Sequence, residues 1–347
     1  MSKILFIEYN LRRLGGGSKA AISIADILKG FGHEIRIHNL EHLDSLFPLE
    51  DLPKYFPCPN LEHELKEIMT ETKEEGHYDL QEVVRTSYEL TPQLEANLQW
   101  ADYVVNSADF LHKTIIERYP GKLINYLHVA PLYVMEPILR DVKYAIANSK
   151  HTYKETKFAC GDDLPLELVY PPINPDMYDN SKPLKDRDID LLFCGRIAPD
   201  KLNTFDFEIL DWQIAAKKYK ALFVGSGWAT GYNPKTEIQF KRNATFAEVR
   251  DAQQNAKIYI HTKPTEDFGQ VITEAMAAGC VVMVPDPSYS AFEFDNVVFY
   301  HGTEDLCFKI LKIMRQLDKY DDSKIRRRSE AQVMYDEAYD KLRELFP

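Results

Sequence analysis

The sequence predicts an α/β protein with two Rossmann-like domains, whose parallel sheets face each other across a cleft. Two observations predict this class. Short apolar segments alternate with amphipathic helical segments through both halves of the chain, which is typical of parallel sheets covered by helices. The 347 residues exceed one ordinary core, and a proline-rich break at residues 168–178 (LVYPPINPDMY) separates the two alternating series.

The first half opens with a strand, a glycine-rich loop and a helix. The apolar run KILFIEY is followed by NLRRLGGGS, and apolar residues then recur at helical spacing as far as Gly30 or Gly32. Ser149 is placed to cap a later helix. Residues 41–100 are acidic and poorly periodic, so they predict loops and short helices. Further strands of this half are expected at residues 33–40, 101–108, 122–129 and 144–149.

The second half repeats the alternation of strands and helices. Between its last two strands we expect a helix over Phe268–Ala278 that stops at Gly279. Residues from about 304 to 346 predict a long amphipathic helical region. Ligands of such folds bind at the carboxyl ends of the strands. The strands of this half are expected at residues 190–197, 220–227, 257–263 and 281–285.

The composition excludes several classes of protein. The chain is 45% hydrophobic and 28% charged, which is typical of a globular protein, and its net charge of −12 offers no basic face for nucleic acid. No apolar run reaches the roughly 20 residues that span a bilayer, so membrane contact is at most peripheral. The N-terminus soon turns polar and is not a signal peptide. Scattered cysteines without a CxxC or a Cys/His cluster fit a reducing compartment, which predicts a cytoplasmic protein.

The most informative segment is TEDFGQVITEAMAAGCVVM, residues 265–283. A helix that begins at the carboxyl end of a strand presents free N–H groups that suit a diphosphate, and Gly269 lets the backbone approach it. Glu274 lies roughly 7–8 Å further along the helix axis, where it suits ribose hydroxyls. Glu266, before the helix, suits the hydroxyls of a sugar. The alternative is that Glu266 is an ordinary acid near a helix start and that Glu274 is solvated.

Three other stretches carry candidate ligand-binding residues. Arg196 and Lys201 lie in the loop GRIAPDK after a strand, where both can bind phosphate oxygens. Gly16 and Gly17 lie in the first glycine-rich loop, which matches neither GxGxxG nor a P-loop. His128 ends a strand of the first half. The acidic run DRDID (186–190) has the look of a metal site, but we interpret it as solvated linker charge and predict no metal site.

Together these stretches resemble the retaining GT-B glycosyltransferases of family 4, over most of the chain. The motifs that carry the resemblance are the first glycine-rich loop, His128 after a strand, VYPPINPDMY, GRIAPDK, LFVGSG and the segment TEDFGQVITEAMAAGCVVMVP. The last is close to the family's Glu-x(7)-Glu segment. The resemblance implies a GT-B fold with residues 1–170 and the helix at about 328–347 on the acceptor side. Residues 171–327 would bind the donor.

Residue by residue, the resemblance implies the following roles. Arg196 and Lys201 bind the donor diphosphate. The backbone at Phe268, Gly269 and Gln270 contacts phosphates and sugar, and Gln270 departs from the family's usual residue. Glu266 binds the sugar and Glu274 the ribose. His128 hydrogen-bonds the sugar, and Gly16 and Gly17 lie against donor and acceptor.

The implied reaction is transfer of a sugar from a nucleoside diphosphate sugar to a hydroxyl group, with retention of anomeric configuration. The donor would be a UDP- or GDP-sugar, and the acceptor a glycan, a lipid-linked or a small molecule. Because cationic side chains and the helix dipole stabilise the leaving group, no metal or other cofactor is required. Two alternatives stay open: a non-catalytic nucleotide-sugar-binding module, and a nucleotide-sugar epimerase on the same scaffold.

Overall fold

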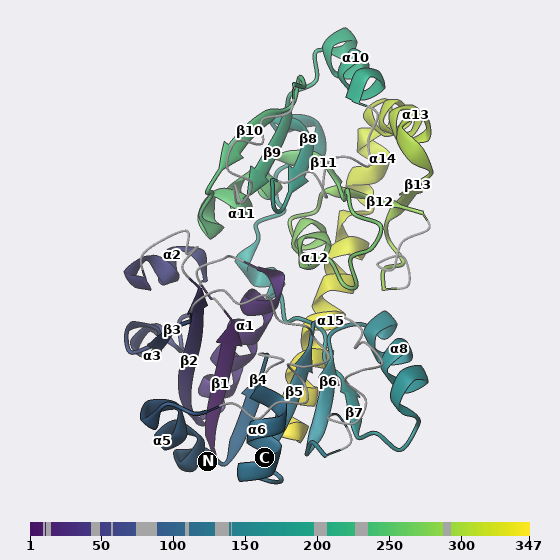
Figure 1. Ribbon diagram of the computed structural model, residues 1–347. Coiled ribbons are helices and arrows are strands. Elements are labelled where there is room, and N and C mark those ends of the chain that lie inside the picture. Colours follow the sequence, from purple (N-terminus) through teal and green to yellow (C-terminus); the bar gives the residue numbers. More distant parts are fainter. Residues whose placement is uncertain are drawn as a thin grey trace. The chain divides into compact units, whose positions relative to one another are not determined.

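The computed structural model divides into two compact units (Figure 1). Unit 1 comprises Met1–Pro172 and Asp336–Pro347, and unit 2 comprises Ile173–Tyr335. The residues that the structure describes are 1–9, 11, 15–42, 49–56, 58–73, 89–107, 111–128, 139, 141–197, 207–225, 235–286 and 293–347.

Unit 1 is built on a parallel sheet of seven strands in the order β3-β2-β1-β4-β5-β6-β7. The chain first builds outward from β1 to β3 and then returns to the other side of β1 with β4. The carboxyl ends of β1 and β4 therefore form the switch point at which such sheets bind ligands. The strands are β1 (Lys3–Tyr9), β2 (Glu34–His42), β3 (Met69–Lys73), β4 (Tyr103–Asn106), β5 (Leu123–Leu127), β6 (Tyr144–Ala147) and β7 (Leu166–Leu168).

Helices of unit 1 cover this sheet, and α1 packs on β1 and β2. Leu5 and Ile7 point from β1 into a core shared with α5, α6 and α8, which buries apolar side chains of all three helices. As the sequence predicted, Ser149 caps α8, because its Oγ accepts a hydrogen bond from the Thr152 N–H at 3.0 Å. The helices are α1 (Gly16–Gly30), η2 (Leu49–Asp51), α2 (Leu52–Tyr55), α3 (Glu62–Lys66), α5 (Pro92–Trp100), α6 (His112–Arg118) and α8 (Lys150–Cys160).

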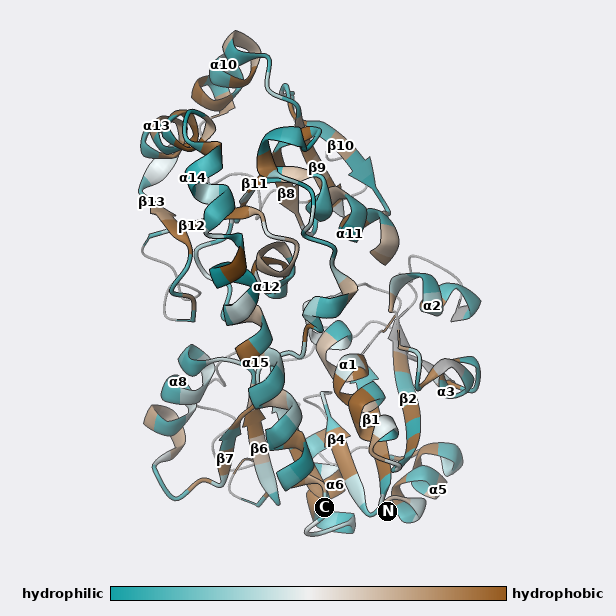
Figure 2. Ribbon diagram, turned by 180° about the vertical axis from the view of Figure 1, so that it is seen from behind, coloured by the Kyte–Doolittle hydropathy of each residue, from teal (hydrophilic) through white to brown (hydrophobic). Residues whose placement is uncertain are grey.

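Unit 2 repeats the topology with six parallel strands in the order β10-β9-β8-β11-β12-β13. Its switch point lies between β8 and β11. Figure 2 shows hydrophobic residues concentrated in the inner strands and along one side of the covering helices. The strands are β8 (Ile189–Cys194), β9 (Ala221–Gly225), β10 (Gln239–Arg242), β11 (Ala256–Ile260), β12 (Val281–Pro285) and β13 (Val298–Tyr300).

The last helix, α15, belongs to both units, since the division at Tyr335 and Asp336 falls within it. Its final turns complete unit 1: Leu342 is buried there, and Phe346, just beyond the helix, packs edge-to-face against Tyr103. The helices of unit 2 are η5 (Pro175–Met177), η6 (Leu184–Asp186), α10 (Phe207–Lys217), α11 (Phe246–Gln254), α12 (Gln270–Ala277), α13 (Gly302–Met314), α14 (Leu317–Asp322) and α15 (Lys324–Leu345).

The structure confirms each strand that the sequence predicted and corrects three other expectations. Residues 41–100 include the strand β3 and the helix α5 besides short helices. β3 (MTETK) was missed because it is polar and pairs only at the edge of the sheet. The predicted C-terminal helical region is three helices, α13 to α15. The predicted helix from Phe268 begins two residues later, at Gln270.

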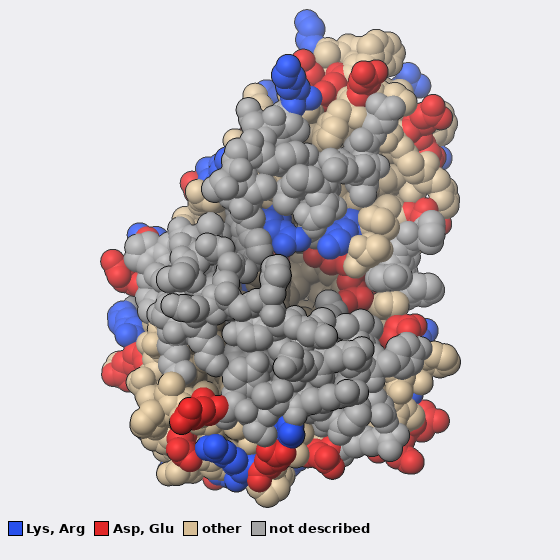
Figure 3. Space-filling view, viewed as in Figure 1, with Lys and Arg blue, Asp and Glu red and all other residues tan. Residues whose placement is uncertain are grey.

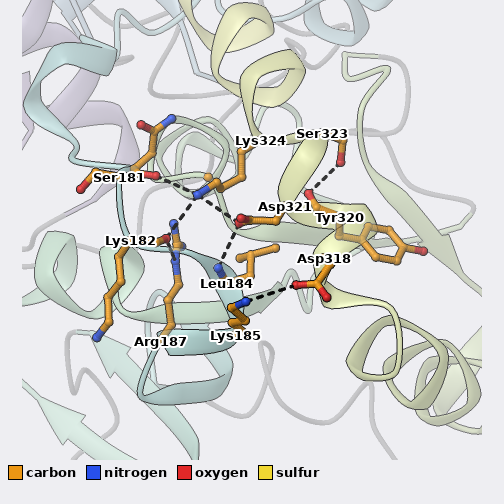
Figure 4. Close-up of polar contacts among 12 residues, drawn as sticks. Ser181, Lys182, Leu184, Lys185, Arg187, Asp318, Tyr320, Asp321, Ser323 and Lys324 are labelled. Carbon is orange, nitrogen blue, oxygen red and sulfur yellow. Dashed lines mark hydrogen bonds and ion pairs between the residues drawn. The ribbon is translucent and has the colours of Figure 1, made fainter.

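The segment between β7 and β8 is fastened to α14 and α15 (Figure 4). Asp321 accepts the Leu184 N–H at 3.0 Å, and its Oδ1 also lies 3.0 Å from Nζ of Lys324. In the run DRDID, Asp186 and Asp188 are exposed, as expected for linker charge. The interpretation is wrong for Arg187 and Asp190, which are buried. Within the described ranges, no group of His, Cys, Asp or Glu is arranged to hold a metal ion.

The surface carries charges of both signs. Figure 3 shows acidic and basic side chains interspersed over the part of this face that the structure describes. Among the helices built from described residues, none combines the length and the apolar character needed to cross a membrane.

Candidate functional site

In unit 2, two neighbouring strands end at candidate ligand-binding segments. β8 runs into Gly195 and the half-buried Arg196, and β11, its neighbour in the sheet, runs into the segment that leads to α12. Gly195 has a φ of +137°, and a Cβ on Gly225 would collide with its carbonyl oxygen. Gly225 is the last residue of β9, so the ends of β8 and β9 approach each other closely here. Both positions therefore need glycine. Lys201, predicted to act with Arg196, lies outside the described residues.

The start of α12 has the features of an anion-binding helix terminus. Gly269 is the N-cap residue and adopts a left-handed conformation with φ of +72°. No side chain caps the helix and its first turn holds no acidic residue, as far as its described residues show. Phe268 is buried and packs against Phe294, with ring centroids 5.7 Å apart. Phe268 can therefore offer a ligand its backbone, and Gln270 follows, half-buried, as the first residue of the helix.

Glu266 lies beside a buried histidine, His261, which was not among the site residues predicted from the sequence. Its Oε2 lies 3.3 Å from Nε2 of His261, whose side chain is 3% exposed. On the other side of the ring, Nδ1 of His261 lies 3.2 Å from the hydroxyl of Tyr259. The hydroxyl of Tyr300 donates to the carbonyl oxygen of His261 at 2.7 Å, which fixes the backbone there. His261 follows a strand, as His128 does, and that placement was the signal available in the sequence.

Glu274 is buried, so the alternative that it is a solvated side chain is wrong. It is 2% exposed, and its Oε2 accepts a hydrogen bond from Nε2 of Gln253 at 3.1 Å. The phenol of Tyr178 is also buried; desolvation raises its pKa well above the usual value, and the charge of Glu274 adds to the effect. A carboxylate kept in such surroundings needs hydrogen-bond partners, and ribose hydroxyls are suitable ones.

The opposite end of α12 is held by three arginines. Arg187 donates to the carbonyl oxygen of Ala278 at 2.8 Å, and Arg327 donates to that of Gly279 at 3.1 Å. Arg328 contacts the carbonyl oxygen of Ala277 at 3.2 Å. The three cations complement the negative end of the helix dipole. Burial lowers the pKa of Arg327 to about 10, so Arg327 remains charged at neutral pH.

In unit 1, the glycine-rich loop and His128 come together. α1 begins at Gly16 after the N-cap residue Gly15, without a side-chain cap. A Cβ on Gly17 would lie 3.0 Å from three atoms of the His128 ring. The backbone of His128 is fixed, because its carbonyl oxygen accepts a hydrogen bond from Nδ2 of Asn148 at 2.8 Å. A side chain at position 17 would therefore crowd the imidazole, which would have to shift by a few tenths of an ångström.

Behind His128 lies a buried polar group that the sequence did not reveal. Tyr126 packs edge-to-face against the His128 ring, with centroids 4.7 Å apart, and its hydroxyl has no partner among the described residues. Glu8, at the end of β1, is 1% exposed and accepts a hydrogen bond from Ser107 at 2.8 Å. Desolvation raises the pKa of Glu8 to about 8, against the opposing effect of hydrogen bonds from Ser107 and Ser18. Glu8 is thus mostly protonated at neutral pH.

The part of the chain that holds the candidate site of unit 2 matches a sequence family. Residues 178–294, all within unit 2, match the profile of the family described as "Glycosyl transferases group 1". The matched residues include Arg196, Glu266 and Glu274. A search of curated protein sequences gave no match.

Solved structures share the architecture of the whole chain. HepE from Anabaena, in complex with UDP and glucose, superposes with a TM-score of 0.68 at 15% identity, covering 99% of this chain and 100% of its own. The chain has a GT-B fold. Sucrose-phosphate synthase from Thermosynechococcus elongatus shares the GT-B fold with a TM-score of 0.73 at 13% identity, over 100% of this chain and 98% of its own. The family match thus lies in unit 2, whereas the GT-B fold extends over the whole chain.

Proposed function

We propose that this protein is a metal-independent, retaining glycosyltransferase that moves a sugar, of the hexose type, from a nucleoside diphosphate sugar to a hydroxyl acceptor. The observation that carries the proposal is the start of α12. An uncapped helix terminus at a sheet switch point lies between two glutamates eight positions apart, in the part of the chain that matches the glycosyl transferase family. HepE is bound to UDP-glucose in one structure, which favours UDP as the nucleotide of the donor.

The donor would lie along α12 in a fixed order. The diphosphate binds at the helix start, where backbone N–H groups and Arg196 stabilise its charge, joined by Lys201. Ribose hydroxyls bind Glu274. The hydroxyls of the transferred sugar bind Glu266, which lies beside His261. In this arrangement each polar part of the donor meets a group of complementary charge or hydrogen-bonding capacity.

The chemical step breaks the bond between the anomeric carbon and the diphosphate and forms one to the acceptor oxygen on the same face. The proton of the acceptor hydroxyl passes to the departing phosphate oxygen, so the step needs no side-chain nucleophile. Charge builds on the diphosphate as the bond breaks, and preorganised donors stabilise that charge with little reorganisation. His128 of unit 1 would donate a hydrogen bond to the sugar and help to carry the charge of the transition state.

Thermal unfolding in the presence of nucleotides tests donor binding. UDP, GDP and their glucose conjugates are added at about 100 times the dissociation constant, which stabilises a binding-competent protein by about 2.7 kcal/mol. For a domain of this size the melting temperature should rise by about 5–10 °C. The Arg196→Ala/Lys201→Ala double variant should lose the rise. Full transfer activity in that variant would contradict the proposed diphosphate site.

Turnover assays separate the proposal from its alternatives. A nuclear magnetic resonance time course should show the first-formed product in the donor's anomeric configuration, with a rate unchanged by EDTA. An epimerase would instead convert the donor without an acceptor. A binding module would bind the nucleotide and show neither transfer nor slow donor hydrolysis. An inverted product would contradict retention, and loss of activity with EDTA would contradict metal independence.

A further inference from the structure

The carboxylate of Glu274 is held by a residue from a different helix. Gln253 lies in the last turn of α11, 21 positions before Glu274, and is fully buried. Its Nε2 donates to Oε2 of Glu274 at 3.1 Å. The backbone of Gln253 is itself fixed, because its carbonyl oxygen accepts hydrogen bonds from Sγ of Cys280 at 3.0 Å and from Arg187 at 3.5 Å.

The orientation of the Gln253 amide follows from the carboxylate. A carboxylate only accepts hydrogen bonds, so the nitrogen of the amide must face it; a rotated amide would bring two acceptors together. With the nitrogen so committed, Oε1 of Gln253 has no partner within the described part of the chain. A buried unpaired acceptor lowers stability. What distinguishes this amide is its hydrogen bond, which fixes the direction of one oxygen of Glu274.

A second glutamine in unit 2 shows what such a residue does when it serves the fold alone. Gln213 of α10 is 3% exposed, and its Oε1 is also unpaired among described residues. Its Nε2 donates to the carbonyl oxygen of Cys307 at 2.8 Å, which ties α10 to α13. Gln253 differs in one respect: its amide holds an ionisable side chain at the candidate site. Gln213 is therefore a matched control for the burial and hydrogen bonding of Gln253.

We propose that Gln253 is a positioning residue, which aims the carboxylate of Glu274 at the ribose hydroxyls of the donor. The proposal rests on the proposed function, in which Glu274 binds ribose. A hydrogen bond to a charged group depends strongly on direction and distance. Without this hydrogen bond the carboxylate can turn away from one of the hydroxyls, so selectivity for ribose should depend on Gln253 as well as on Glu274.

The test measures ribose selectivity by isothermal titration calorimetry. Dissociation constants are determined for UDP and for its 2′-deoxy and 3′-deoxy forms, with the corresponding guanosine series in parallel. The wild type should favour the ribonucleotide by about tenfold or more, the size expected for a hydrogen bond to a charged group. The variants are Gln253→Met, which keeps the length without a donor, Glu274→Gln, their combination, and the control Gln213→Met.

The expected result is that Gln253→Met loses most of the selectivity for ribose, whereas Gln213→Met keeps it. The double variant should be no less selective than Glu274→Gln alone, because the two substitutions disrupt the same interaction with ribose and their effects do not add. If Gln253→Met does not fold, the shorter Gln253→Asn should show a partial loss. If Gln253→Met or Gln253→Asn keeps the selectivity of the wild type while Glu274→Gln loses it, the role of Gln253 is refuted and the proposed function is not. A wild type that binds no nucleoside diphosphate would overturn the proposed function, and this inference with it.

Discussion

Replacing Arg187 with methionine should destabilise unit 2 by removing the clamp at the end of α12. The guanidinium is 2% exposed and donates to the carbonyl oxygens of Ala256 and Ala278, each at 2.8 Å. It also donates to the carbonyl oxygen of Lys182 at 3.2 Å, through Nε. Methionine fills much of the same space but donates no hydrogen bond. Two fully buried carbonyl groups, those of Ala256 and Ala278, would then lose a donor.

The size of the effect follows from those two groups. A buried polar group that loses its partner costs about 1–3 kcal/mol. Removal of a buried cation offsets part of this loss, because the cation is costly to desolvate. We therefore expect a decrease of about 2–4 kcal/mol in the free energy of unfolding. Since 1 kcal/mol changes the melting temperature of such a domain by about 2–4 °C, the expected decrease is about 4–16 °C.

Differential scanning calorimetry measures this change directly. The control is Arg326→Met, which removes a charge of the same kind from an exposed position of α15. The control should change the melting temperature by no more than about 2 °C, because exposed substitutions are usually within 0.5 kcal/mol. If Arg187→Met melts with the wild type, the carbonyl groups at the end of α12 do not depend on this side chain, and the reasoning is refuted.

Three further changes test the glycines and the buried acid. Gly269→Ala should weaken UDP binding, because alanine at φ of +72° is strained and its Cβ would lie 2.9 Å from Cδ1 of Ile272. The control is Gly302→Ala, which has the same φ but open space around the Cβ, and it should leave the dissociation constant for UDP unchanged. Gly17→Ala should lower kcat by displacing the His128 ring, whereas Gly15→Ala, whose Cβ meets nothing within 4 Å, should not; equal kcat values would contradict the role of this contact. Glu8 has a pKa of about 8 in the folded protein against an ordinary value of 4.5. Between these two pH values the folded state binds one proton that the unfolded state does not. The free energy of unfolding should therefore fall as pH rises through this range, by up to about 1.4 kcal/mol per pH unit. Urea unfolding of Glu8→Gln should show a flatter pH dependence than the wild type, and identical profiles would show that Glu8 is ionised when folded.

Much of the fold could be predicted because the inner strands carry their own signal. β5 (LINYL) and β12 (VVMVP) are nearly continuous apolar runs, as strands covered on both faces must be. β10 (QFKR) lies at an edge of its sheet and has a mixed pattern that a loop could equally have. The strands that could not be predicted from the sequence are those that form because an adjacent strand supplies backbone hydrogen bonds.

The candidate site likewise includes residues that could be predicted from the sequence and residues that could not. Glu266, Gly269 and Glu274 could be proposed from spacing, since all three lie on one short strand-to-helix segment. His261 and Gln253 could not be assigned to those glutamates, because their roles depend on contacts across the fold. Burial of Arg187 was missed for the same reason: its partners are carbonyl groups, which every residue has.

The shared helix α15 has a consequence for the order in which the protein folds during synthesis. Residues 336–347 contribute Ala338, Leu342 and Phe346 to the interior of unit 1, yet the ribosome makes them only after all of unit 2. Unit 1 is therefore the first to emerge and the last to be completed. Until then its nascent sheet lacks the apolar cover that these residues supply, and the side chains that they will cover stay exposed to solvent.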